Sequence, residues 1–241
     1  MRGPRRRYLA ELGIPVWSLR HPPAAAGEKA AETPANVADT PANAAPVDAD
    51  DAWSALRREV EACTRCALAR GRTQTVFGVG RRDASLMVVG EAPGAEEDRQ
   101  GEPFVGPAGQ LLNAMLRAIG FARGDVYIAN VLKCRPPHNR DPRPEEAVAC
   151  SAYLDRQIEL VRPRAMLAVG RISAQWLLQT DRPVGRLRGV VHRYGERGIP
   201  LVVTYHPAYL LRTPAAKAKS WQDLCMLVEL LVPNETSRAD R

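Results

Sequence analysis

Hydrophobic positions in the chain follow the pattern of strands that alternate with helices from about residue 51 onward. Four short apolar runs are typical of buried strands in a parallel sheet; they span residues 85–90, 126–129, 164–170 and 199–204. Apolar residues at helical spacing and helix start and stop signals predict the helices 53–62, 108–119, 144–161 and 215–231. This alternation predicts an α/β fold of three layers, α/β/α, around a central, mainly parallel four-stranded sheet.

The first 50 residues differ in composition from the rest of the chain. Residues 21–50 hold eleven Ala and five Pro and no aromatic residue. Such a segment cannot bury enough apolar surface to offset its chain entropy, so we expect a flexible linker there. Residues 1–20 are basic and partly apolar, and form a short segment that packs on the domain or binds a partner. We expect the folded domain at 51–233 and a C-terminal tail at 234–241.

Side chains capable of chemistry follow three of the predicted strands. Glu91 comes directly after the first strand, Asn130 after the second, and His206 shortly after the fourth. Ligands of open α/β sheets bind outside the carboxyl ends of the strands, so we expect these residues to converge on one cleft, with Phe104 nearby. An amide, a stacking ring and an imidazole donor suit a nucleobase that gains negative charge. Each residue alone also has a purely structural interpretation, as a turn, a cap or packing.

Four of the five cysteines are spaced like metal ligands. Cys63 and Cys66 form a C-x-x-C pair, and Cys134 and Cys150 follow the predicted second strand. Disulfides fit less well, because the N-terminus lacks the apolar run of a signal peptide. Thiolates bind both zinc and iron–sulfur clusters, and the spacing alone leaves these two open. Cys225 lies in an apolar helical pattern and is expected to be a buried free thiol.

The formal net charge is +7, and the charges of the two N-terminal segments cancel, so the predicted domain carries the excess. A basic domain favours a polyanionic partner such as nucleic acid. Most of the basic residues are Arg, which a bias in codon usage would also produce, so charge alone leaves the partner open. No stretch of the sequence reaches the roughly 18 apolar residues of a membrane span, and we expect a cytoplasmic protein with no membrane association.

Five motifs together resemble the family 4 uracil-DNA glycosylases. They are GEAPG at 90–94, PFVGPAGQLL at 103–112, the N-x-x-K-C-R-P-P run at 130–137, NRDPRPEE at 139–146 and HPAYLLR at 206–212. The resemblance implies the uracil-DNA glycosylase fold and excision of uracil from DNA, which leaves an abasic site and initiates base excision repair. It also implies a [4Fe–4S] cluster on Cys63, Cys66, Cys134 and Cys150. We expect the protein to be a monomer and its partner to be uracil-containing DNA.

The resemblance also implies roles for single residues. Phe104 would stack on a uracil flipped out of DNA, and Asn130 would read its Watson–Crick edge. His206 would donate to the uracil oxygen that gains charge as the bond breaks. Glu91 is a candidate for orienting the attacking water, for contacting the substrate or for holding the loop. Further substrate contacts are expected at Ala92, Gly94 and Glu97, and DNA contacts at Leu210, Leu211 and Arg212.

Two positions depart from the best-known uracil-DNA glycosylases. Ala92 stands where those enzymes carry an Asp that activates water, as is usual in family 4, and Gly94 stands where they carry a bulky Tyr. A sister group traps the abasic sugar on a His near this chain's His138, but the basic run that marks those proteins is missing here. Lys133 is the one lysine near the motifs that a Schiff-base step could use. The alternative to hydrolysis is therefore a non-catalytic or covalently trapping uracil-DNA-binding protein.

Overall fold

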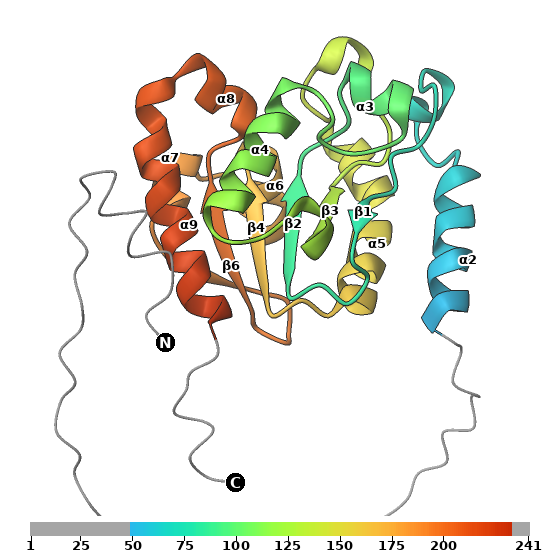
Figure 1. Cartoon of the computed structure of the whole chain (residues 1–241). Coiled ribbons are helices and arrows are strands. Elements are labelled where there is room, and N and C mark those ends of the chain that lie inside the picture. The colour runs from blue at the N-terminus through green and yellow to red at the C-terminus, as the bar shows by residue number, and fades with distance from the viewer. Residues whose placement is uncertain (1–48, 233–241) are drawn as a thin grey trace, which may run out of the picture. The chain divides into compact units, whose positions relative to one another are not determined.

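The computed structural model of the chain describes residues 49–232 (Figure 1). The N-terminal segment 1–20, the tail 234–241 and all but the end of the predicted linker lie outside the described residues. Helix α2 (Ala49–Glu61) begins within the last residues of that linker. The folded domain therefore starts slightly earlier than the composition of the chain indicated.

One mixed sheet forms the centre of this domain. Its strands are β1 (Val79–Gly80), β2 (Leu86–Gly90), β3 (Tyr127–Asn130), β4 (Ala165–Val169), β5 (Val191–Tyr194) and β6 (Ile199–Thr204). The spatial order is β1-β3-β2-β4-β6-β5. The four central strands pair in parallel and correspond to the four that were predicted. The predicted count of four strands is corrected to six, because β1 and β5 add antiparallel edges. Neither edge strand has a continuous apolar run, since β1 is two residues long and β5 alternates between exposed and half-buried positions.

Helices cover both faces of the sheet. Alternate strand residues point to opposite faces, and β2, β3 and β4 are buried at every position, so both faces need a covering layer. On one face, Met87 and Val89 pack with apolar residues of α2, α5 (Pro144–Val161) and α6 (Arg171–Leu178). On the other face, Leu86 and Val88 pack with residues of α4 (Pro107–Ala118) and α9 (Lys217–Leu231). Figure 1 shows α4 and α9 on one side of the strands and α5 on the other. The three-layer α/β/α fold is thereby confirmed.

Short helices that the pattern did not predict fill the connections. They are α3 (Ala95–Gln100), α6, α7 (Val184–Leu187), α8 (Pro207–Arg212) and the 3-10 turns η1 (Ala67–Arg70), η2 (Arg123–Asp125), η3 (Pro137–Asn139) and η4 (Pro214–Ala216). The chain passes from β2 to β3 on one side and then crosses to β4 on the other. The crevice at such a switch point is where open α/β sheets bind ligands. In residues 49–232, no helix is both long and apolar enough to cross a membrane.

Candidate active site

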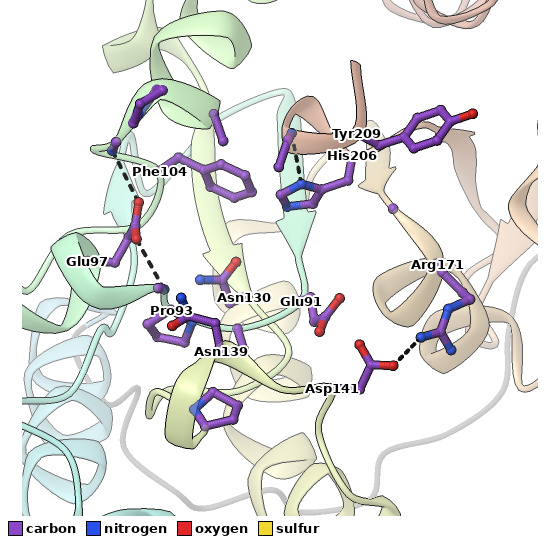
Figure 2. Close-up of a pocket in the computed structure, with 18 of the residues that line it drawn as sticks. Glu91, Pro93, Glu97, Phe104, Asn130, Asn139, Asp141, Arg171, His206 and Tyr209 are labelled. Carbon is purple, nitrogen blue, oxygen red and sulfur yellow. Dashed lines mark hydrogen bonds and ion pairs between the residues drawn. The ribbon is translucent and has the colours of Figure 1, made fainter. Parts of the chain in front are cut away.

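A cavity of about 870 Å³ lies at the carboxyl ends of the parallel strands. Glu91 follows β2 directly, Asn130 is the last residue of β3, and His206 follows β6 after one intervening residue. Phe104 reaches the same cavity from the loop before α4. Figure 2 shows these four side chains around one space. The strand-end residues expected to converge therefore do line a single cavity.

Asn130 offers an unused acceptor inside this cavity. The residue is only 2% exposed, and its Oδ1 has no hydrogen-bond partner among the described residues. A buried polar atom without a partner costs about 1–3 kcal/mol, which a ligand donor would recover. Asn130 pairs with Gly90 across β3 and β2, and a Cβ on Gly90 would lie 2.4 Å from Oδ1 and 2.6 Å from Cζ of Phe104. Because Gly90 has no side chain, there is room for the amide of Asn130 and the ring of Phe104.

The ring of Phe104 is presented by a strained turn. Its φ of 55° lies in the left-handed region, which is uncommon for residues other than glycine. Arg123 supports this turn, since its guanidinium donates to the carbonyl oxygens of Pro103 and Phe104. Gly109 packs beneath it, where a Cβ would lie 1.8 Å from the Phe104 oxygen. These contacts place the Phe104 ring 5.7 Å from that of His206, centroid to centroid.

His206 caps the start of α8 and is held in its neutral form. Its Nδ1 accepts a hydrogen bond from the backbone N–H of Ala208 at 3.1 Å. Burial, with a smaller contribution from Arg212, lowers the pKa of His206 to about 4, although Glu97 opposes the shift. Because Nδ1 is an acceptor, the single proton of the neutral ring resides on Nε2. The imidazole can therefore donate to a ligand at neutral pH without carrying a charge itself.

Glu91 shares its side of the cavity with an ion pair of Asp141 and Arg171 (Figure 2). Burial and, next, the negative charge of Asp141 raise the pKa of Glu91 to about 7, while Arg171 acts in the opposite direction. A carboxylate with such a pKa is suited to accept a proton from water near neutral pH. Sequence reasoning gave no role to Asp141 or Arg171, because thirty positions separate them and only the fold makes them neighbours.

Glu97 joins the two loops that border the cavity. Its Oε1 accepts from the backbone N–H groups of Val105 at 2.9 Å and Gly106 at 3.3 Å, and its Oε2 accepts from that of Gly94 at 3.1 Å. A Cβ on Gly94 would lie 2.6 Å from Oε2, so the close approach depends on glycine. Ala92, Gly94 and Glu97 all line the cavity, but both oxygens of Glu97 are engaged by the protein. The contacts of Glu97 are those of a loop support.

The three residues expected to contact DNA are consecutive on α8, but their side chains face different surroundings. Leu210 is 1% exposed and belongs to the core, which corrects its assignment as a DNA contact. Leu211 is 46% exposed, because neighbouring residues of a helix point in directions about 100° apart. Arg212 lines the cavity, and so does Tyr209, a partly exposed residue that sequence reasoning did not single out.

Two residues weighed for other chemistry lie outside the cavity. His138 is exposed, and Lys133 is fully buried, with its Nζ donating to the backbone oxygen of Asn130 and to Oε1 of Gln157. Neither lines the cavity that the described residues form. Lys133 is therefore not placed to attack a sugar bound there, whereas His138 is exposed and lies between Pro136 and Asn139, which do line the cavity.

The four ligand-like cysteines surround a second cavity, lined by Cys63, Cys66, Cys134 and Cys150. Arg72 donates to Sγ of Cys134 at 3.2 Å, and the backbone N–H of Lys133 donates to Sγ of Cys150 at 3.3 Å. Burial raises the pKa of both thiols, that of Cys150 to about 11, and these donors oppose the shift by favouring the thiolate, the form that binds metals. All five cysteines are free thiols, and Cys225 is partly buried on α9. Between residues 49 and 232, no three His, Cys, Asp or Glu side chains form a group that could hold a single metal ion.

Residues 77–225 match the family model described as the uracil DNA glycosylase superfamily. A type-4 uracil-DNA glycosylase of Archaeoglobus fulgidus is 44% identical over 180 residues, which are 72% of this chain and 90% of that protein. The chain belongs to the type-4 uracil-DNA glycosylases. This confirms the family that the five motifs indicated.

Two further relatives agree with this assignment. A type-4 uracil-DNA glycosylase of Thermotoga maritima is 42% identical over 166 residues, 68% of this chain and 85% of that protein. A type-5 uracil-DNA glycosylase of Pyrobaculum aerophilum is 34% identical over 153 residues, 54% of this chain and 64% of that protein. The glycosylase thus shares more of its length and more identical residues with these type-4 relatives than with this type-5 one.

Proposed function

We propose that this glycosylase hydrolyses the N-glycosidic bond of a uracil rotated out of DNA into the 870 Å³ cavity, leaving an abasic site for base excision repair. Uracil removal is the activity of its family. The observation that carries the proposal in this chain is the buried, unpartnered Oδ1 of Asn130. It lies beside an aromatic ring and a neutral imidazole in one cavity.

Asn130 supports recognition of uracil by its hydrogen-bonding edge. Uracil presents a donor at N3 and an acceptor at O4, which match an amide oxygen and an amide N–H in one plane. Cytosine presents an acceptor and a donor at these positions, so it opposes the same orientation of the amide. An unmatched buried pair costs about 1–3 kcal/mol, which favours uracil about 5- to 150-fold. Phe104 would supply the face on which the base stacks.

His206 and Glu91 support the chemical step. When the bond between C1′ and N1 breaks, its electron pair moves to the uracil ring, and the sugar becomes oxocarbenium-like. The Nε2–H of His206 donates to the uracil oxygen that gains charge, and a hydrogen bond to a charged group is worth about 1.5–3 kcal/mol. Water then attacks C1′ and gives its proton to the Glu91 carboxylate. Uracil leaves as an anion and takes a proton from solvent.

We also propose that the second cavity holds a [4Fe–4S] cluster on its four cysteines. Their side chains come from the chain before β1, the loop after β3 and helix α5, so a shared cluster would join these segments. Four thiolates are the ligand set of such clusters, and the N–H donors at Cys134 and Cys150 suit bound thiolates. Within residues 49–232, the two cavities share no lining residue. The role of the cluster is therefore structural and not chemical.

The test of the proposed function uses the purified full chain and three labelled oligonucleotides that differ only in one base: uracil, thymine or cytosine. Alkali treatment and a denaturing gel should show breakage at uracil alone. A slowly migrating adduct would identify covalent trapping instead. DNA binding without breakage or adduct would identify a non-catalytic binding protein. Asn130→Ala is the matched variant, and an undiminished preference for uracil in that variant would remove Asn130 from base reading.

A further inference from the structure

Lys133 is a buried cation without a carboxylate beside it. Its side chain is among the largest fully buried ones, with 1% of the residue exposed. Its Nζ donates to two neutral acceptors, the backbone oxygen of Asn130 at 2.8 Å and Oε1 of Gln157 at 2.6 Å. No Asp or Glu among residues 49–232 forms an ion pair with it. Burying an ammonium without a counter-charge costs several kcal/mol, so burial favours the neutral amine unless a negative group lies close by in the interior.

The cysteine site supplies such a group. Lys133 lines the cysteine cavity, and its backbone N–H donates to Sγ of Cys150 at 3.3 Å. Burial lowers the pKa of Lys133 to about 8, and the negative charges of Cys150, Asp155 and Cys134 oppose that shift. Asp155 is exposed and bonded to the hydroxyl of Tyr194, so water screens its charge. The two cysteines are buried, and attraction between charges is stronger there than at the surface. A cluster bound by four thiolates carries net negative charge, which would offset the buried ammonium.

The same ammonium holds the strand end that reads the base. It binds the carbonyl of Asn130, whose side chain lines the active-site cavity. Its other acceptor, Gln157 of α5, donates to the backbone oxygen of Phe77 at 2.9 Å and to the hydroxyl of Tyr127 at 3.1 Å. Gln157 is therefore fixed on both sides, and the network joins α5 to β3. A change of charge at the cysteines would therefore act on the ammonium of Lys133, and this ammonium holds the main chain of Asn130.

We propose that Lys133 is a positioning residue that couples the cluster to uracil recognition. Its charge balances the cluster, and its hydrogen bond fixes the main chain of Asn130. This inference rests on the proposed cluster and adds to it a link to the active site. A second link is the ion pair between Arg140, which lines the active-site cavity, and Glu146, which lines the cysteine cavity.

The test compares Lys133→Met, which removes the charge and the donor, with Lys133→Arg, which keeps the charge. Lys217→Met, at an exposed position on α9, is the matched control. Iron content, the reduction potential of the cluster and single-turnover excision are measured on each full-length protein. A nearby positive charge favours the reduced cluster, so Lys133→Met should lower the potential and Lys133→Arg should largely retain it. Lys133→Met should also slow uracil excision at least about tenfold and narrow the preference for uracil over cytosine.

The outcomes separate this coupling from the cluster itself. A wild type without iron would overturn both. An iron-loaded Lys133→Met protein with unchanged potential and unchanged excision would overturn the coupling alone. If Lys133→Met does not fold, Gln157→Glu gives the same comparison, because a carboxylate beside Nζ also cancels its charge. Gln157→Glu should lower the potential, and an unchanged potential in that variant would likewise overturn the coupling.

Discussion

Gly90 and Asn130 are opposite each other at the ends of two neighbouring parallel strands, and the absence of a side chain on the first makes room for the amide of the second. The Phe104 ring lies against the same glycine. The site thus depends on the absence of a single methyl group at Gly90. This relationship leads directly to a test of the site geometry.

Gly90→Ala should slow uracil excision about 100-fold while the domain stays folded. The new methyl group would lie under 3 Å from Oδ1 of Asn130 and from the Phe104 ring, so both side chains must shift. Displacements of about 1 Å at a reacting site can cost that much in rate. Gly124→Ala is the control, since a Cβ there meets no atom within 4 Å. Equal single-turnover rates for the two variants would show that the packing at Gly90 is irrelevant to the reaction.

Glu91 should impose a pH dependence on excision. Its pKa of about 7 means that the carboxylate becomes protonated, and unable to accept a proton from water, as the pH falls through neutrality. The rate should therefore fall on the acid side of about pH 7, and Glu91→Gln should be slow and show no such fall. Asp141→Asn removes a charge that raises this pKa, so the acid limb should move to lower pH. A Glu91→Gln profile identical to that of the wild type would exclude Glu91 as the base.

Substitutions of the two leucines of α8 should have different effects, with Leu210→Ala lowering stability and Leu211→Ala slowing excision from duplex DNA. Leu210→Ala leaves a cavity in the core and should cost about 2–5 kcal/mol of unfolding free energy. Leu211→Ala changes an exposed side chain, so it should cost little stability, but it should slow excision from duplex DNA if Leu211 fills the gap left by the flipped base. Thermal unfolding and duplex excision of both variants are the measurements. Unimpaired excision by Leu211→Ala would remove that role.

Cys134→Ser should lose iron, visible absorbance and thermal stability together. The change removes one of the four sulfur atoms around the second cavity and replaces the sulfur that accepts from Arg72 with a hydroxyl oxygen. Cys225→Ser is the control, because that thiol lies on α9 and does not line the cavity. Zinc in a colourless wild type would identify a zinc site instead. A stable, fully active and metal-free Cys134→Ser protein would contradict any metal at these cysteines.

The sequence predicted most of the site because the relevant residues follow strands that are apolar throughout. The runs that end at Gly90 and Asn130 are buried on both faces, so hydrophobicity marks the strands and, with them, the edge where ligands bind. The edge strand β5 has no such run, since only half of its residues face the domain. It therefore became visible only through its pairing with β6.

Long-range contacts and the phase of a short helix could not be predicted from local patterns. The Asp141–Arg171 pair and the bonds of Glu97 to the loop before α4 depend on how distant segments meet. Leu210 and Leu211 are neighbouring residues of the same type, so the sequence does not indicate which one is buried. Only the packing of α8 decides that Leu210 faces the core. The strain at Phe104 is likewise fixed by a distant residue, Arg123.

The most direct test of the account is the single-turnover rate of uracil release by His206→Ala beside the wild type, on one uracil oligonucleotide. Iron content and thermal unfolding should show that the variant is intact. The account predicts a rate about 10- to 100-fold lower, because the hydrogen bond to the departing uracil anion is lost. Since the pKa of His206 is about 4, the variant should keep the acid limb near pH 7 that belongs to Glu91. An unchanged rate would contradict the mechanism, and a lost acid limb would mean that His206 itself titrates in that range.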